Sequence, residues 1–145
     1  MSRCIETWFA TLLVGLVLSG ASIQSPYAQQ SANRPTILQK GETEDIPGRE
    51  VVSAILELPP NGPAGRHTHP GTEIGYVLEG SATLIIEGQA AREVKAGDSW
   101  IIGAGIPHEG RAGPAGVKVL GTFVVEKGKP LAIPAPRSGD EVKRR

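Results

Sequence analysis

The sequence of 145 residues has little cysteine, few aromatic residues, no excess of either charge and no long apolar run. Its single cysteine, Cys4, excludes a disulfide framework within the chain. With two Trp, two Tyr and two Phe, a core must be built mainly from Val, Ile, Leu and Ala. Fifteen basic and fifteen acidic residues balance, which gives no support to nucleic acid or an anionic membrane surface as a partner.

The first segment has the layout of a secretory signal peptide. A short polar start precedes Phe9 to Leu18, an apolar run of about ten residues, which is well short of the roughly 20 that a transmembrane helix needs. We predict a signal peptide over residues 1–28, cut after Ala28 or alternatively after Ala21, and a periplasmic or secreted protein without a stable membrane span after cleavage. A retained membrane anchor or a buried helix is the other interpretation. Cleavage would remove the only thiol, so any bound metal must be held by nitrogen and oxygen.

Short apolar and β-branched segments separated by Gly and Pro predict an all-β sandwich or barrel, and no helical periodicity of useful length appears after residue 30. Within a single domain, residues 29–44 are expected to form a leader or arm, 45–128 the barrel, and 129–145 a Pro-rich and charged tail. The tail is expected either to lie over the barrel or to stay disordered. The expected strands are 51–58, 67–78 (interrupted near Pro70), 81–87, 92–95, 99–102 and 117–125.

Beyond the predicted cleavage site, the chain contains three histidines, and two of them form His67-Thr68-His69. On a strand, residues i and i+2 share a face, with Cα atoms about 6.6–6.8 Å apart, so two imidazoles can converge on one ion. Glu73 has the same parity, provided that Pro70 does not bend the strand out of register. His108 follows a Gly-rich turn that can start a strand pairing back against the first ligand strand.

Three neutral imidazoles and one carboxylate suit a transition metal better than Ca²⁺ or Mg²⁺. The sequence therefore predicts one divalent transition metal, such as Fe, Mn, Ni, Co, Cu or Zn, bound by His67, His69, Glu73 and His108. Octahedral coordination would leave two positions open for water, a bidentate substrate or dioxygen. A lone histidine is usually a surface or core residue, but here every histidine beyond residue 28 falls within one motif.

These residues also carry a resemblance to the cupin family. The first cupin motif is matched by Gly62-PAGR-His67-T-His69-PGT-Glu73-IGYVLE-Gly80, with the leading Gly one residue closer than usual. The second is matched by Gly97-DSWII-Gly103-A-Gly105-IP-His108-EGRA, where Gly103 replaces the usual Pro and Ala112 stands where Asn is common. The resemblance covers about residues 45–127 and leaves the metal ligands intact.

The resemblance implies a double-stranded β-helix, the jelly-roll barrel, with a ligand cavity inside. It also implies that the chain pairs as a homodimer. The inward faces of 51–58 and 117–125 should line an apolar cavity. Arg66 and Glu109 flank ligands, and strand alternation would point both away from that cavity, as surface or supporting groups.

Three classes of function follow for such a protein, each with a small molecule as substrate or ligand. The first is a metal-dependent oxidoreductase of the dioxygenase type. The second is a metal-dependent isomerase, lyase or hydrolase, for which no acid or base partner stands out. The third is a non-catalytic binder of a small molecule or metal. No catalytic residue and no organic cofactor site can be named from the sequence, and fold alone does not decide among the classes.

Overall fold

A computed structural model describes residues 34–137, and the predicted signal peptide lies outside them. The described chain is all-β, as the sequence predicts, and contains no helix, so none in this part is long and apolar enough to cross a membrane. The strands are β1 Thr36–Glu42, β2 Arg49–Leu58, β3 Pro63–Thr68, β4 Gly71–Ile86, β5 Arg92–Lys95, β6 Ser99–Ile102, β7 His108–Glu126 and β8 Ile133–Pro134.

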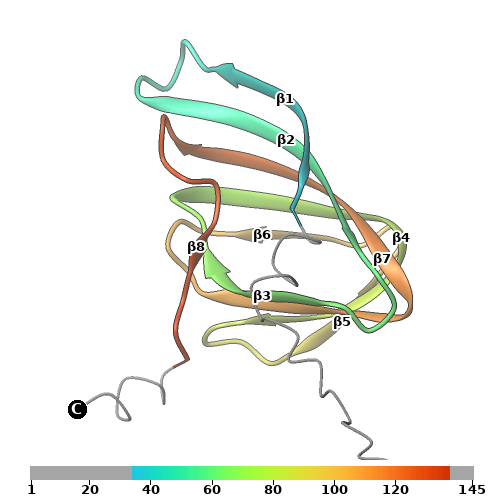
Figure 1. Cartoon of the computed structure of the whole chain (residues 1–145). Coiled ribbons are helices and arrows are strands. Elements are labelled where there is room, and N and C mark those ends of the chain that lie inside the picture. Colours follow the sequence, from blue (N-terminus) through green and yellow to red (C-terminus); the bar gives the residue numbers. More distant parts are fainter. Residues whose placement is uncertain (1–33, 138–145) are drawn as a thin grey trace, which may run out of the picture.

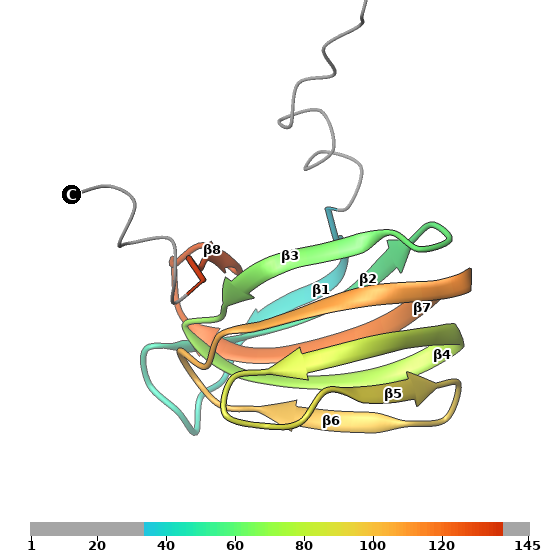
Figure 2. The same ribbon diagram turned by 90° about the horizontal axis from the view of Figure 1, so that it is seen from below.

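Two long strands, β4 and β7, organise the barrel. The C-terminal half of β7 pairs with β2 and with the first half of β4, while its N-terminal half pairs with β3 and with the second half of β4. All pairs are antiparallel, and β5 and β6 extend the sheet from β4. Figure 2 shows β5 and β6 on one side of the barrel and β1, β2 and β3 on the other. This double winding is the jelly-roll architecture that the sequence predicts.

Alternating burial along β2, β4 and β7 places apolar side chains inside the barrel. One cluster of buried residues includes Leu58, Val77, Val94 and Ile102. A smaller cluster, which lies beside His69, contains Val52, Ala54, Phe123 and Val125. β4 runs on through Gly80, which has a positive φ of 75° and lies against the Gly116 carbonyl. A side chain there would be both strained and overlapping, so glycine is required for the strand to continue.

Both ends of the described chain join the sheet. β1, within the segment expected to be an arm, pairs with β2 at the edge of the barrel, and all of its residues are exposed (Figure 1). β8, within the predicted tail, pairs with β3 beside His67. Within residues 129–137, Ile133 and Pro134 are therefore joined to the sheet.

Candidate metal centre

The four predicted ligands meet at one end of the barrel. His67 lies on β3, His69 follows it, Glu73 lies on β4 and His108 begins β7. The register pairs His67 directly with His108, which is the strand pairing predicted for the segment after the Gly-rich turn. That turn is held in place because Gly105, with a positive φ of 69°, donates its backbone N–H to the His69 carbonyl at 2.9 Å.

The three imidazoles form a compact group. Each offers one nitrogen, and these nitrogens all lie within 4.8 Å of one another, so the three histidines could hold a metal ion. The ring centroids are 4.3 to 5.1 Å apart. Glu73 completes the group, with Oε2 lying 3.1 Å from His69 Nε2 and 3.0 Å from His108 Nε2. His69, Glu73 and His108 are buried, whereas His67 is half-buried.

Backbone carbonyls fix the tautomer of all three histidines. Nδ1 of His67 lies 2.6 Å from the Gly65 carbonyl, Nδ1 of His69 lies 2.6 Å from the Leu131 carbonyl, and Nδ1 of His108 lies 2.9 Å from the Ile106 carbonyl. Because a carbonyl can only accept, each Nδ1 must carry the proton and donate it. The Nε2 lone pairs of the neutral rings are therefore left for a ligand, which is the arrangement found around metal-binding histidines.

The structure supplies a test of whether a cation fits this group. Glu73 Oε2 and His108 Nε2 are both buried, and neither has a hydrogen-bond partner of acceptable geometry. They nevertheless lie 3.0 Å apart. With Nδ1 protonated, both atoms are acceptors, and two buried acceptors at this distance require a proton or a cation between them. The donor set and its orphaned atoms fit a metal ion.

The protonation equilibria agree with this picture. Burial would raise the pKa of Glu73, but interactions with His108 and His69 outweigh burial and hold the pKa of this carboxyl well below its usual range. Burial would lower the pKa of His108, but the Glu73 carboxylate outweighs it and raises that pKa above 6.5. Burial lowers the pKa of His67 to about 4. Glu73 is thus ionised and His67 neutral near pH 7.

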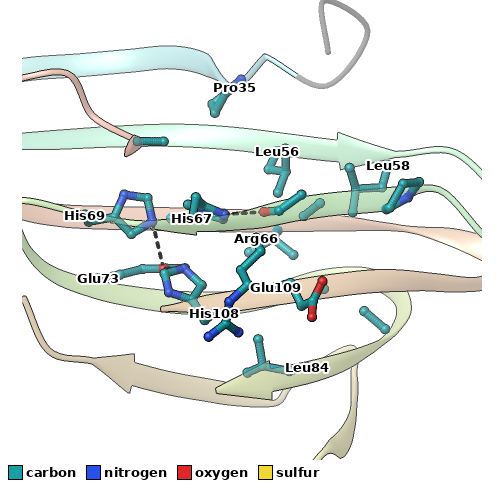
Figure 3. Close-up of a pocket in the computed structure, with 18 of the residues that line it drawn as sticks. Pro35, Leu56, Leu58, Arg66, His67, His69, Glu73, Leu84, His108 and Glu109 are labelled. Atoms are coloured by element: carbon teal, nitrogen blue, oxygen red, sulfur yellow. Dashed lines mark hydrogen bonds and ion pairs between the residues drawn. The ribbon is translucent and has the colours of Figure 1, made fainter. Parts of the chain in front are cut away.

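Trp100 packs in the hydrophobic core and also contacts Glu73, one of the four candidate ligands. It is buried on β6, and its indole Nε1–H donates to Glu73 Oε1 at 3.0 Å. The register places Trp100 opposite Gly75 on β4. A Cβ atom at Gly75 would overlap with the indole, so the glycine leaves the space in which Trp100 reaches the carboxylate (Figure 3 shows the neighbouring ligands).

Arg66 and Glu109 border the cavity, but their charged groups have partners among surface residues. Arg66 donates to the exposed Glu87 at 2.9 Å and to the Pro136 carbonyl at 3.3 Å. Glu109 accepts from Arg137 at 2.7 Å. A register shift in β3 between Ala64 and His67 breaks strict alternation and brings Arg66 to the edge of the cavity, contrary to the expectation from alternation. Glu109 also lines that edge, so the same expectation is wrong for it.

Similarity to known proteins identifies the type of domain that carries this site. The cupin domain family matches residues 54–123, the segment that carries both motifs. This barrel is a cupin domain. No curated protein matches the sequence.

Solved structures with similar folds show how widely this cupin barrel is shared. An uncharacterized conserved protein with a double-stranded β-helix domain from Klebsiella pneumoniae subsp. pneumoniae MGH 78578 is 19% identical, with a TM-score of 0.58, over 70% of this chain and 84% of that one. The DMSP lyase DddQ from Ruegeria pomeroyi DSS-3 is 22% identical, with a TM-score of 0.56, over 62% of this chain and 45% of the lyase. The oxalate decarboxylase of Bacillus subtilis is 21% identical, with a TM-score of 0.56, over 72% of this chain and 30% of that one. The cupin therefore spans less than half of either named enzyme, and the likeness concerns the fold.

Proposed function

We propose that this cupin binds one divalent transition metal through His67, His69, Glu73 and His108 and oxidises a small organic substrate with dioxygen. The observation that carries the metal proposal is the convergence of three imidazole nitrogens with the orphaned, buried Oε2 of Glu73. A bound metal with this ligand set supplies open coordination positions for a chelating substrate and for dioxygen.

The chain's own residues would orient and shield this chemistry. Trp100 holds Glu73, and three backbone carbonyls hold the imidazoles, so the ligand atoms need little rearrangement to bind. The cavity next to the ligands has a mainly apolar lining, which would favour an apolar part of a substrate over water. Among the described residues that line the cavity, no acid or base outside the ligand cluster lacks a partner, and this favours an oxidation over chemistry that needs a separate proton carrier.

The second candidate is a metal-dependent lyase or isomerase, with the metal as a Lewis acid. Glu73 is the observation in its favour, because it is an ionised carboxylate at the metal end of the cavity and could accept a substrate proton if it left the metal. Two proteins with the same fold carry the names of a lyase and a decarboxylase. The third candidate, a non-catalytic binder, needs only the cavity.

One experiment separates these candidates. The full chain is purified after export without chelators, and its metal content is measured beside that of His67→Ala and of the control Glu109→Gln, which flanks a ligand. We expect about one metal per chain in the wild type and the control and none in His67→Ala. Turnover of enolic and catecholic compounds is then compared with and without oxygen.

Dioxygen consumption that matches product formation would support the oxidoreductase. Equal rates under nitrogen would contradict it and favour the lyase or isomerase. A compound recovered bound to the protein and never converted would favour the binder, and absence of metal even after reconstitution would contradict the metal proposal itself.

We also propose that the cupin is exported and that it forms a homodimer. The apolar run and small residues before position 28 support export, which an N-terminal mass measurement on the secreted protein would test. Exposed Ile74, Tyr76 and Ile101 form an apolar patch on adjacent strands β4 and β6, and this supports a dimer. Light scattering during gel filtration would test it, because a monomer at micromolar concentration contradicts the proposal.

A further inference from the structure

The cavity extends far beyond the ligand cluster. Its volume is about 870 Å³, within the range of pockets that hold organic ligands of drug-like size. Away from the ligands its wall is mainly aliphatic. Its apolar lining residues include Leu56, Leu58, Ala64, Leu84, Val117 and Val119.

The aliphatic wall continues along two neighbouring strands. On β2 the inward residues run from Ala54 to Leu58, a distance of roughly 13 Å at 3.3 Å per residue. On β7 they run from Phe123, paired with Glu73, to Val117, which is roughly 20 Å by the same rise. Figure 3 shows the ligand cluster at one end of this space and Leu58 at the other.

The polar side chains on the wall are already engaged. Arg66 and Glu109 bind Glu87 and Arg137, Thr83 donates to Glu93, and the Trp100 indole donates to a ligand carboxylate. Outside the ligand cluster, the described lining therefore presents no unpartnered polar side chain to a bound molecule. A polar group buried there would lose its hydrogen bonds to water without replacement.

We infer that the cavity takes an amphiphilic ligand with one metal-chelating head and an uncharged apolar body. The head would lie at His67, His69 and His108, and the body, an aliphatic chain or a hydrocarbon ring, would run along Leu56 toward Leu58. A small dianion that is polar at both ends would leave most of this wall uncovered. The inference rests on the proposed metal site, because the head needs a metal to bind.

A series of n-alkyl hydroxamic acids tests the inference on the metal-loaded protein. Each probe has the same chelating head, and the alkyl chain grows from two to six to eight carbons. Each methylene buried in an apolar site improves binding about fourfold. We expect the dissociation constant, measured by calorimetry, to fall at least tenfold from the two-carbon to the six-carbon probe. Metal content is checked after each titration, so that stripping of the metal is not mistaken for binding.

Variants locate the effect on the wall. Leu56→Gln places an amide in the path of the chain, and the control Ile55→Gln lies on the same strand but outside the cavity lining. Leu56→Gln should abolish most of the gain with chain length while leaving the two-carbon probe unchanged, and Ile55→Gln should change neither. If Leu56→Gln does not fold, Ala64→Leu serves instead, because its larger side chain fills part of the cavity from β3. In this variant the affinity should stop rising at a shorter alkyl chain than in the wild type.

The outcomes distinguish this inference from the proposed function. Binding of the two-carbon probe without any gain from longer chains would overturn the inference and leave the metal site standing. A gain that Leu56→Gln and Ala64→Leu leave intact would also overturn it, because the chain would then lie elsewhere. A wild-type protein that binds neither metal nor the two-carbon probe would overturn the proposed function and the inference with it.

Discussion

Replacing Trp100 by Phe should weaken metal binding although Trp100 is not a ligand. The substitution keeps an aromatic ring opposite Gly75 but removes the Nε1–H that donates to Glu73 Oε1 at 3.0 Å. A hydrogen bond from a neutral donor to a buried carboxylate contributes about 1.5–3 kcal/mol, which corresponds to roughly 10- to 150-fold in an equilibrium constant. Loss of such a supporting contact typically reduces metal affinity about 10- to 100-fold, so we expect a loss in that range.

Competition with a chromophoric chelator measures the affinity, and thermal unfolding of the metal-free protein measures the separate cost of the lost indole volume. Ile102→Val is the matched control, since Ile102 is buried on the same strand and pairs with Glu73 through the backbone. We expect it to destabilise the fold by about 1 kcal/mol with little change in metal affinity. The reasoning is refuted if Trp100→Phe binds metal within twofold of the wild type, or if Ile102→Val loses as much affinity.

Three further predictions concern the same site, and a fourth concerns the tail. Gly75→Ala should weaken metal binding at least as much as Trp100→Phe, because the added Cβ overlaps with the indole and displaces it; normal affinity in the same competition assay would contradict this. Apparent metal affinity, measured between pH 4 and 8, should fall by at least about tenfold per pH unit below the raised pKa of His108, since the metal must displace that proton. The dependence should be steeper near pH 4, where His67 also takes up a proton. In the metal-free protein, the lowered pKa of His67 means that the unfolded chain binds more protons than the folded chain between about pH 4 and 6.5. The contribution of His67 to the free energy of unfolding should therefore decrease as the pH falls through that window, and urea unfolding at several pH values would measure it. Truncation before Leu131 removes the carbonyl that orients one imidazole and should reduce metal affinity roughly 10- to 100-fold, whereas truncation after residue 137 should not.

The sequence predicts the convergence of the four candidate ligands because its signals are local. His67 and His69 differ by two positions on one strand, and the turn before His108 marks where the partner strand begins. The predicted segments 92–95 and 99–102 coincide with β5 and β6. Segment boundaries are less accurate where glycine does not end a strand. β4 continues through Gly80, although the sequence divides it there. β7 runs unbroken from His108 to Glu126, whereas the sequence predicts 117–125 as a separate strand.

The missed features depend on contacts between distant parts of the chain. The hydrogen bond from Trp100 to Glu73 joins residues 27 positions apart, and it follows from the β4–β6 register, which no local pattern specifies. The carbonyl that orients His69 comes from Leu131, 62 positions away in the Pro-rich tail. β1 lacks an apolar alternation because both of its faces are exposed, so it gives no strand signal.

The four candidate metal ligands of this cupin differ in which atoms orient them. The imidazoles are oriented by backbone carbonyls, whose positions depend on the strands and turns and change little when neighbouring side chains are replaced. Glu73 is oriented by a side chain, Trp100, and so is the ligand most sensitive to substitution. The side chains of Leu56 and Leu58 line the cavity wall and do not orient any of the four ligands. They can therefore determine which molecule binds beside the metal. Substitutions on the wall should therefore alter which organic molecule binds while metal affinity is preserved. Substitutions around Trp100 should lower metal affinity while the preference for the organic molecule is preserved.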